Sequence, residues 1–264
     1  MSKRIAIIGG GNLGISIAEG LLAGGFTEAS DITVTRRNIS LLQPLQARGV
    51  KISDNNVAAC READVVLLAV KPFQVKEVLR EIGGTIGQNK MVISVVTGVS
   101  IPELAAELEK GVPVFRAMPN TAIAIRESMT CIAHHEAGPG QVEFVMELFT
   151  HLGRVVLIDE KLMDAATVLG ACGTAYAMRY IRANIQGGIE IGFDAATASL
   201  IAAQTVKGAA ELLLQKGAHP EQEIDKVTTP KGCTIAGLNE MEHQGFSSSL
   251  IKGISASYVK IQKG

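Results

Sequence analysis

The sequence has no long apolar run and almost no net charge. Its longest uninterrupted apolar stretch, Val65–Val70, is far shorter than the roughly 20 residues that a membrane-spanning helix needs. The formal net charge is −1, from 25 basic and 26 acidic side chains, so no strong field attracts nucleic acid or an anionic membrane. These absences predict a protein that neither spans a membrane nor binds nucleic acid as its main function.

Cysteine is also scarce, and no export signal is visible. The four cysteines lack Cys-x-x-Cys spacing, which argues against a zinc site and a disulfide framework: Cys60, Cys131, Cys172 and Cys233. We expect buried or half-buried free thiols. The apolar stretch after Lys3 and Arg4 ends at Ile8, which is too short for the apolar region of a signal peptide. The predicted compartment is therefore the cytoplasm.

The first part of the chain has the pattern of an α/β fold. Its short β-branched runs alternate with segments of helical length, such as 38–48, 74–86 and 101–110. This alternation predicts a doubly wound, largely parallel sheet with helices on both faces. The expected strands are residues 4–8, Ile32–Thr35, Val50–Ile52, Asp64–Val70, Met91–Val96, Val114–Met118, Met129–Ala133 and Val155–Ile158.

After Asp159 the pattern becomes helical, and we place a domain boundary there, giving domains 1–159 and 160–264. Helices are expected near 161–186, 195–216, 233–244 and 247–262. The helix at 195–216 is the clearest, because Asp194 can cap its start and Gly217 can end it. Small residues dominate the helical faces, so the helices can approach closely. We expect this all-α domain to complete its core against a second copy.

A glycine-rich motif follows the first predicted strand. Gly9-x-Gly11-x-x-Gly14 comes directly after residues 4–8, and a helical pattern begins at its end. A dinucleotide pyrophosphate needs this arrangement, because it requires a tight turn, a close backbone approach and free N–H groups at a helix N-terminus. A plain glycine-rich turn is the alternative. The predicted cofactor contacts here are Gly9, Gly11, Asn12, Leu13 and Gly14.

The residues after the second predicted strand indicate which dinucleotide binds. An acidic side chain at this position would bind the ribose 2′-hydroxyl of NAD. This chain instead reads Thr35-Arg36-Arg37-Asn38, and two guanidinium groups suit a 2′-phosphate. NADPH is therefore the predicted cofactor, with NADH binding more weakly. The alternative is that both arginines are simply solvated at the end of a strand.

Three further segments are candidates for ligand contacts. Ala69-Val70-Lys71-Pro72 ends the fourth strand, and Met118-Pro119-Asn120-Thr121 follows a later one. Strand carboxyl ends face the ligand crevice in a doubly wound sheet. At 228–238, hydroxyl groups and a glycine precede a predicted helix, whose free N–H groups suit a carboxylate. A solvated lysine, a turn and a plain helix cap are the respective alternatives.

Taken in order, these motifs resemble the pyrroline-5-carboxylate reductase family. The resemblance rests on the glycine motif, Ala69–Pro72, Arg116–Thr121, Gly173-x-Ala175-Tyr176 and Pro220–Leu238. It implies an N-terminal Rossmann domain and a C-terminal helical dimerisation domain, with dimers that assemble further into decamers. It also implies the last step of L-proline biosynthesis, in which a hydride moves from NAD(P)H to the imine carbon of 1-pyrroline-5-carboxylate, a cyclic imino acid.

The resemblance assigns roles to individual residues, none of them as a metal ligand. Arg36 and Arg37 would hold the 2′-phosphate. The adenosine side would be bound by Asn56, Ala69, Val70, Lys71 and Pro72. The substrate would be held by Asn120 and by a loop that contributes Val227, Thr229, Lys231, Gly232 and Cys233. Thr234, at the end of this loop, is the candidate to hydrogen-bond the ring nitrogen, because its hydroxyl can both donate and accept.

The chain departs from the family pattern in two substrate-side segments. The family's Ser-Gly-Ser-Gly-Pro-Ala-Tyr reads Gly170-Ala171-Cys172-Gly173-Thr174-Ala175-Tyr176 here, and its Pro-Gly-Gly reads Pro230-Lys231-Gly232. Ala122 also replaces a proline after Thr121. These departures leave two alternatives open. One is an NADP-linked reductase of another imine or a 3-hydroxy acid, and the other is an NADP-binding regulator with weak catalysis.

Overall fold

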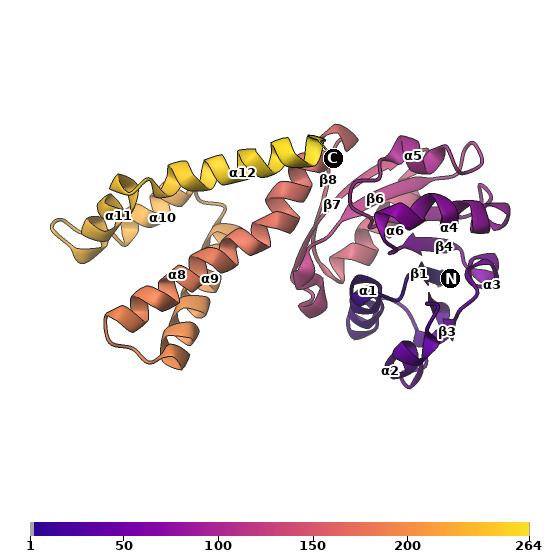
Figure 1. Ribbon diagram of the computed structural model, residues 1–264, viewed down its shortest axis with the longest axis horizontal. Coiled ribbons are helices and arrows are strands. Elements are labelled where there is room, and N and C mark those ends of the chain that lie inside the picture. Colours follow the sequence, from indigo (N-terminus) through magenta and orange to yellow (C-terminus); the bar gives the residue numbers. More distant parts are fainter. Residues whose placement is uncertain (1–2, 264) are drawn as a thin grey trace. The chain divides into compact units, whose positions relative to one another are not determined.

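A computed structural model of the chain describes residues 3–263 (Figure 1). The chain divides into two compact units. Unit 1 runs up to Cys172 and includes the last residues from Ile261, and unit 2 is Gly173–Lys260. The sequence placed the domain boundary earlier, near 159, and that division stays a prediction. Each unit is described separately below.

Unit 1 is built on one eight-stranded sheet with the order β3-β2-β1-β4-β5-β6-β7-β8. All neighbouring strands are parallel except β6 and β7, which pair antiparallel. This arrangement confirms the predicted doubly wound fold. The strands are β1 Ile5–Ile8, β2 Ile32–Thr35, β3 Lys51–Ser53, β4 Val65–Leu68, β5 Met91–Ser94, β6 Val114–Met118, β7 Ser128–His135 and β8 Gly153–Leu157.

Helices cover both faces of the sheet because the central strands are apolar on both sides. Alternate residues of β1 enter two separate cores: Ile5 and Ile7 belong to one, and Ala6 and Ile8 to the other. On the first face lie α1 Asn12–Ala23, α2 Gln43–Gln46 and α6 Pro139–Thr150. On the second face lie α3 Asn56–Glu62, α4 Val75–Ile82, α5 Ile101–Ala105 and α7 Met163–Ala166.

The register of the central strands brings three loops to one edge of the sheet. Ile8 at the end of β1 pairs with Thr35 of β2 on one side and with Leu68 of β4 on the other. The loops that follow β1, β2 and β4 therefore begin at the same edge of the sheet. Because the strand order runs in opposite directions on the two sides of β1, this edge is the switch point at which such folds bind ligands.

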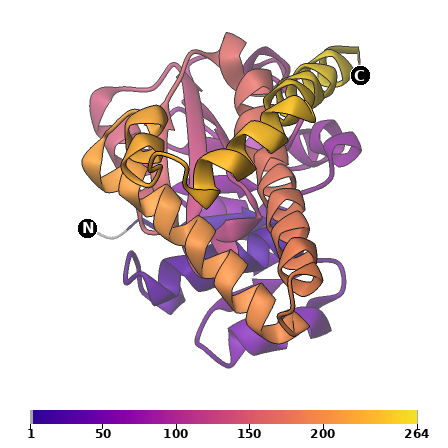
Figure 2. The same ribbon diagram turned by 90° about the vertical axis from the view of Figure 1, so that its left-hand side faces the viewer.

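Unit 2 is entirely helical, as predicted (Figure 2). Its helices are α8 Gly173–Glu190, α9 Ala195–Lys216, α10 Pro220–Lys226, α11 Cys233–His243 and α12 Phe246–Lys263, the last of which ends in unit 1. The carboxylate of Asp194 accepts from the backbone N–H groups of Ala196 and Thr197, each at 3.0 Å, and Gly217 ends the helix at φ 63°. Both ends of α9 are thus confirmed.

Two helical predictions need correction. The single helix expected at 161–186 is interrupted, because a π-helical turn at Thr167–Cys172 separates α7 from α8. Helix α10 was not predicted, because Pro220–Lys226 is polar and has no apolar periodicity. Its start nevertheless carries recognisable signals, since the His219 ring accepts from the Glu221 N–H at 3.3 Å and Pro220 occupies the first turn.

Unit 2 buries very little of its own apolar surface. Between Gly173 and Lys260 only Ala198 and Ala202, both on α9, are buried. A Cβ at Gly188 of α8 would lie 3.1 Å from that of Ala198, so the two helices approach closely there. Several large apolar side chains are instead exposed, including Ile191, Leu200 and Ile251. No described helix combines the length and apolar character that a membrane crossing requires.

Three of the four thiols are inside or partly inside the fold. Cys60 and Cys131 are buried and Cys172 is partly buried, as predicted, and all four cysteines are free. Burial raises the pKa of Cys60 to about 12, so this thiol stays protonated at neutral pH. Cys233 is exposed, and the expectation of burial was wrong for it because it occupies the first turn of α11 rather than an apolar face.

Candidate active site

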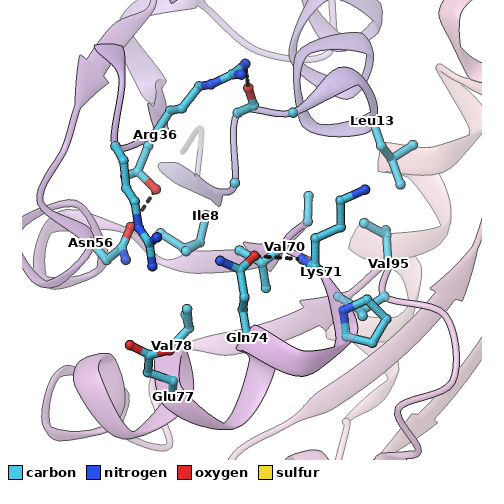
Figure 3. A pocket seen from close by; sticks show the side chains of 18 of the residues that line it. Ile8, Leu13, Arg36, Asn56, Val70, Lys71, Gln74, Glu77, Val78 and Val95 are labelled. Atoms are coloured by element: carbon cyan, nitrogen blue, oxygen red, sulfur yellow. Dashed lines mark hydrogen bonds between the residues drawn. The ribbon is translucent and has the colours of Figure 1, made fainter.

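A cleft of about 910 Å³ lies at the switch-point edge of unit 1 (Figure 3). Its walls come from the loops after β1, β2, β3, β4 and β5 and from α4. With the exception of Gly14, every residue that the sequence assigned to cofactor binding lines this cleft: Gly9, Gly11, Asn12, Leu13, Thr35, Arg36, Arg37, Asn56, Ala69, Val70, Lys71 and Pro72.

The glycine turn has little room for side chains. Gly9 adopts φ +113°, and a Cβ there would lie 2.6 Å from the Ala69 carbonyl oxygen. A Cβ on Gly14 would lie 2.2 Å from the Gly9 carbonyl oxygen, so Gly14 packs directly against the turn. Gly14 does not itself line the cleft. Gly11 begins α1 without a side-chain cap. The first N–H groups of this helix are therefore available to an anionic ligand.

The end of β2 holds the glycine turn by backbone and side-chain hydrogen bonds. The N–H groups of Gly9 and Gly10 both donate to the Thr35 carbonyl oxygen, at 3.2 and 2.7 Å. The Arg36 guanidinium donates from Nη1 to the Gly10 carbonyl oxygen at 2.7 Å. Arg37, the next residue, is exposed on the rim of the same cleft.

A chain of polar side chains continues from β2 to α4. The Thr35 hydroxyl donates to Oδ1 of Asn56 at 2.7 Å, and Nδ2 of Asn56 donates to a carboxylate oxygen of Glu81 at 3.0 Å. These contacts fix the orientation of the Asn56 amide at the cleft wall. Glu81 was not predicted as a site residue. Its single signal in the sequence is its position on the helix that follows Lys71-Pro72.

The segment after β4 forms the opposite wall of the cleft. The Ala69 N–H donates to the Ile8 carbonyl oxygen at 2.8 Å, which places the segment beside the glycine turn. The backbone N–H of Lys71 donates to the Gln74 side chain at 3.2 Å. Figure 3 shows the Lys71 side chain extending from this point toward the Leu13 side of the cleft. Ala69-Val70-Lys71-Pro72 therefore lines the cleft, and its contact with a cofactor stays a prediction.

The motif Arg116–Thr121 is an anchor in the interior of unit 1. The Arg116 side chain is only 5% exposed and pairs with Glu160 at 2.9 Å and with Asp164 at 3.8 Å. Because buried charges are costly unless paired, this cluster fixes the chain after β8 against β6. Asn120 accepts from the Ala122 N–H at 3.0 Å and donates to the Gly170 carbonyl oxygen at 3.2 Å. One N–H of the Asn120 amide therefore remains for the substrate contact that the sequence predicts.

The predicted substrate loop lies in unit 2 and connects the end of α10 to the first turn of α11. The Gly232 N–H donates to the Thr229 carbonyl oxygen at 2.9 Å, which closes a tight turn. Lys231 occupies this turn at φ 61°, a left-handed conformation that glycine adopts most readily. A Cβ on Gly232 would meet Thr229 Oγ1 at 2.6 Å. Gly232 begins α11 without a side-chain cap, so the first N–H groups of that helix are free for a carboxylate.

Comparison with known proteins identifies related chains over nearly the whole length. A profile described as pyrroline-5-carboxylate reductase dimerisation matches residues 160–263, and one described as NADP oxidoreductase, coenzyme F420-dependent, matches 4–98. Pyrroline-5-carboxylate reductase 1 of Dictyostelium discoideum is 46% identical over 96% of this chain, which spans 48% of that protein. Pyrroline-5-carboxylate reductase 2 of the same organism is 43% identical, over 99% of this chain and 93% of the relative.

Solved structures agree with this assignment. A pyrroline-5-carboxylate reductase from Coxiella burnetii has a TM-score of 0.94 and 29% identity, covering 100% of this chain and 98% of that one. A Plasmodium falciparum pyrroline carboxylate reductase with NADP bound shares the fold, with a TM-score of 0.87 and 23% identity over 99% of this chain and 98% of that one. From these matches and the switch-point cleft, the chain belongs to the pyrroline-5-carboxylate reductase family.

Proposed function

We propose that this chain reduces 1-pyrroline-5-carboxylate to L-proline with NADPH. The observation that carries the proposal is the cleft at the switch point, lined by the glycine turn and by Arg36 and Arg37, in a chain whose relatives are named for this reaction. The residues present fit the cofactor. The start of α1 offers unpaired N–H groups next to a glycine turn that lines the cleft, and Arg36 and Arg37 line the same cleft.

The reaction requires little acid-base machinery. A nicotinamide held in this cleft would supply the hydride that reduces the imine carbon, while the C=N electron pair would pass to the nitrogen, which already carries the iminium proton. The protein then has to align two rings and hold the substrate carboxylate. No histidine lines the described cleft, which agrees with a reaction of this type. Lys71, Asn56 and the glycine turn hold the cofactor, and the Thr229–Thr234 turn holds the substrate.

Thr234 is the residue that we assign to the ring nitrogen. It lies in the first turn of α11 and is exposed, and its hydroxyl makes no hydrogen bond within the described part of the chain. Lys231, in the same turn, adds a cation beside the free N–H groups of the helix. The turn thus offers a hydroxyl, a cation and backbone donors within a few residues, which suits a small anionic imine.

Thr234→Val should lower turnover while leaving folding and NADPH binding intact. The change keeps the branched shape and removes one hydroxyl. If that hydroxyl makes one hydrogen bond near the transition state, the loss is about 0.5–1.5 kcal/mol, or roughly severalfold to tenfold in kcat/KM. Steady-state kinetics with saturating NADPH measure this loss.

Cys233→Ala is the matched control for Thr234→Val. It alters the neighbouring side chain in the same helical turn, and we assign Cys233 to the substrate loop through its backbone and not through its thiol, so turnover should be close to that of the wild type. Wild-type turnover in Thr234→Val together with inactivity in Cys233→Ala would reverse the assignment. The loop would then act through the thiol.

We further propose that unit 2 forms the interface of a homodimer and that such dimers assemble further into a decamer. Support comes from the near absence of buried residues between Gly173 and Lys260 and from the apolar side chains left exposed there. An exposed apolar face of this extent marks an interaction surface. The match of residues 160–263 to a dimerisation profile supports a second copy as the partner.

Leu200→Glu should weaken this association. Leu200 is 71% exposed on α9, and burying a leucine contributes about 1.5–3 kcal/mol, so the dimer dissociation constant should rise by roughly ten- to a hundredfold. Sedimentation velocity across a concentration series measures the shift. Leu41→Glu, at a leucine of unit 1 that is 51% exposed, is the control and should sediment like the wild type. An unaltered dimer in Leu200→Glu would place the interface elsewhere.

The experiment that tests the proposed function is NADPH oxidation by the purified protein in the presence of 1-pyrroline-5-carboxylate. Formation of L-proline in equal amount to NADP⁺ supports the proposal. Turnover of another cyclic imine or a 3-hydroxy acid, with none of 1-pyrroline-5-carboxylate, would transfer the assignment to a different reductase reaction. NADPH binding without any turnover would indicate an NADP-dependent regulator.

A further inference from the structure

We infer that Arg36 is a positioning residue of the glycine turn, and that it does not discriminate NADPH from NADH. The inference rests on the proposed nicotinamide-dependent function and separates the roles of two adjacent arginines. Arg36 is partly buried and hydrogen-bonded, whereas Arg37 is exposed and makes no hydrogen bond or ion pair to any residue that the structure describes.

The first step of the argument is that Gly10 is held at both of its backbone groups. Its N–H donates to the Thr35 carbonyl oxygen at 2.7 Å, and its carbonyl oxygen accepts from Nη1 of Arg36 at 2.7 Å. Figure 3 shows this second contact reaching the turn from the end of β2. Gly10 is also closely packed, because a Cβ there would lie 2.7 Å from a methyl group of the Leu42 side chain.

The second step concerns the peptide group between Gly10 and Gly11. A trans peptide is planar, with its C=O and N–H pointing in opposite directions. By fixing the Gly10 carbonyl, Arg36 also fixes the direction of the Gly11 N–H. Gly11 lines the cleft and begins α1, so this N–H belongs to the set of donors that faces the pyrophosphate. The pyrophosphate is common to NADPH and NADH.

The third step is the contrast with Arg37. Its guanidinium is on the rim of the cleft with all of its donors uncommitted among the described residues. A group in this state can bind a phosphate in the bidentate manner that arginine favours. Recognition of the 2′-phosphate is therefore the role of Arg37, and loss of Arg36 should affect both nucleotides alike.

The test is a binding titration of NADPH and of NADH, followed by nicotinamide fluorescence and made without imine substrate. In Arg36→Ala both dissociation constants should rise by a similar factor, roughly tenfold or more for a charged donor. Their ratio should stay at the wild-type value. Arg36→Lys, which keeps the charge and is the safer variant for folding, should also leave the ratio unchanged. In Arg37→Ala the ratio should move against NADPH.

A shift of the ratio against NADPH in Arg36→Ala would show direct phosphate recognition and overturn the inference. Unchanged binding of both nucleotides would also overturn it, because the turn would then keep its geometry without Arg36. Turnover is not part of this readout. A chain that binds both nucleotides as expected but does not reduce 1-pyrroline-5-carboxylate would refute the substrate assignment and still support the role of Arg36.

Discussion

Arg37→Ala is expected to raise the KM for NADPH by roughly ten- to a hundredfold, because a bidentate arginine–phosphate contact contributes about 1.4–3 kcal/mol. The KM for NADH should change little, since NADH has a hydroxyl in place of the 2′-phosphate. Initial rates measured with each cofactor at saturating imine give both values. The preference for NADPH over NADH should largely disappear in this variant.

Arg61→Ala provides the matched control for Arg37→Ala. Arg61 is exposed at the end of α3 and does not line the cleft, so its removal changes the net charge equally without touching the cofactor. Both KM values should remain at wild-type levels. Equal increases for NADPH and NADH in Arg37→Ala would remove the 2′-phosphate assignment from this residue.

Gly14→Ala should nearly abolish cofactor-dependent activity. The added Cβ would lie 2.2 Å from the Gly9 carbonyl oxygen, which no side-chain adjustment relieves, because the obstructing atom belongs to the backbone. Either α1 or the glycine turn must move. A displacement of about 1 Å at a reacting or binding group can cost on the order of a hundredfold in rate, and we expect at least that loss in kcat/KM for both cofactors.

Gly140→Ala is the corresponding control. Gly140 lies in the first turns of α6, and no atom lies within 4 Å of its added Cβ. An alanine at an unstrained helical position stabilises a protein by about 0.4–1 kcal/mol, so this variant should melt at or slightly above the wild-type temperature with full activity. Undiminished NADPH binding in Gly14→Ala would contradict this prediction, because the turn or α1 would then have moved without any effect on the cofactor site.

The parts of the fold that depend on local pattern could be predicted from the sequence. The central strands β1, β4 and β5 are short apolar runs that are buried on both faces, and α9 carries a capping Asp194 and a terminal Gly217. The glycine turn and Lys71 could be placed at one edge because parallel strands end together. The interruption at Thr167–Cys172 could not be predicted, because a π-helical turn does not alter the apolar pattern of the segment.

The details of the site depend on contacts that sequence spacing does not encode. Arg36 and Arg37 are indistinguishable as two adjacent arginines, and only the distance from Arg36 to the Gly10 carbonyl separates their roles. Glu81 joins the site through Asn56, which lies 25 positions away in the chain. The left-handed backbone of Lys231, at φ 61°, could not be predicted either, because a residue with a Cβ rarely adopts that conformation.

The scarcity of buried residues between Gly173 and Lys260 has a consequence for how the chain acquires its native state. A segment that covers its apolar surface only against a second copy gains little free energy from ordering alone. Folding of these helices and association of two chains are then one thermodynamic event, and the concentration of the chain enters its folding equilibrium. In the homodimer that we propose, the helices of unit 2 would therefore reach their native state only together with a second chain.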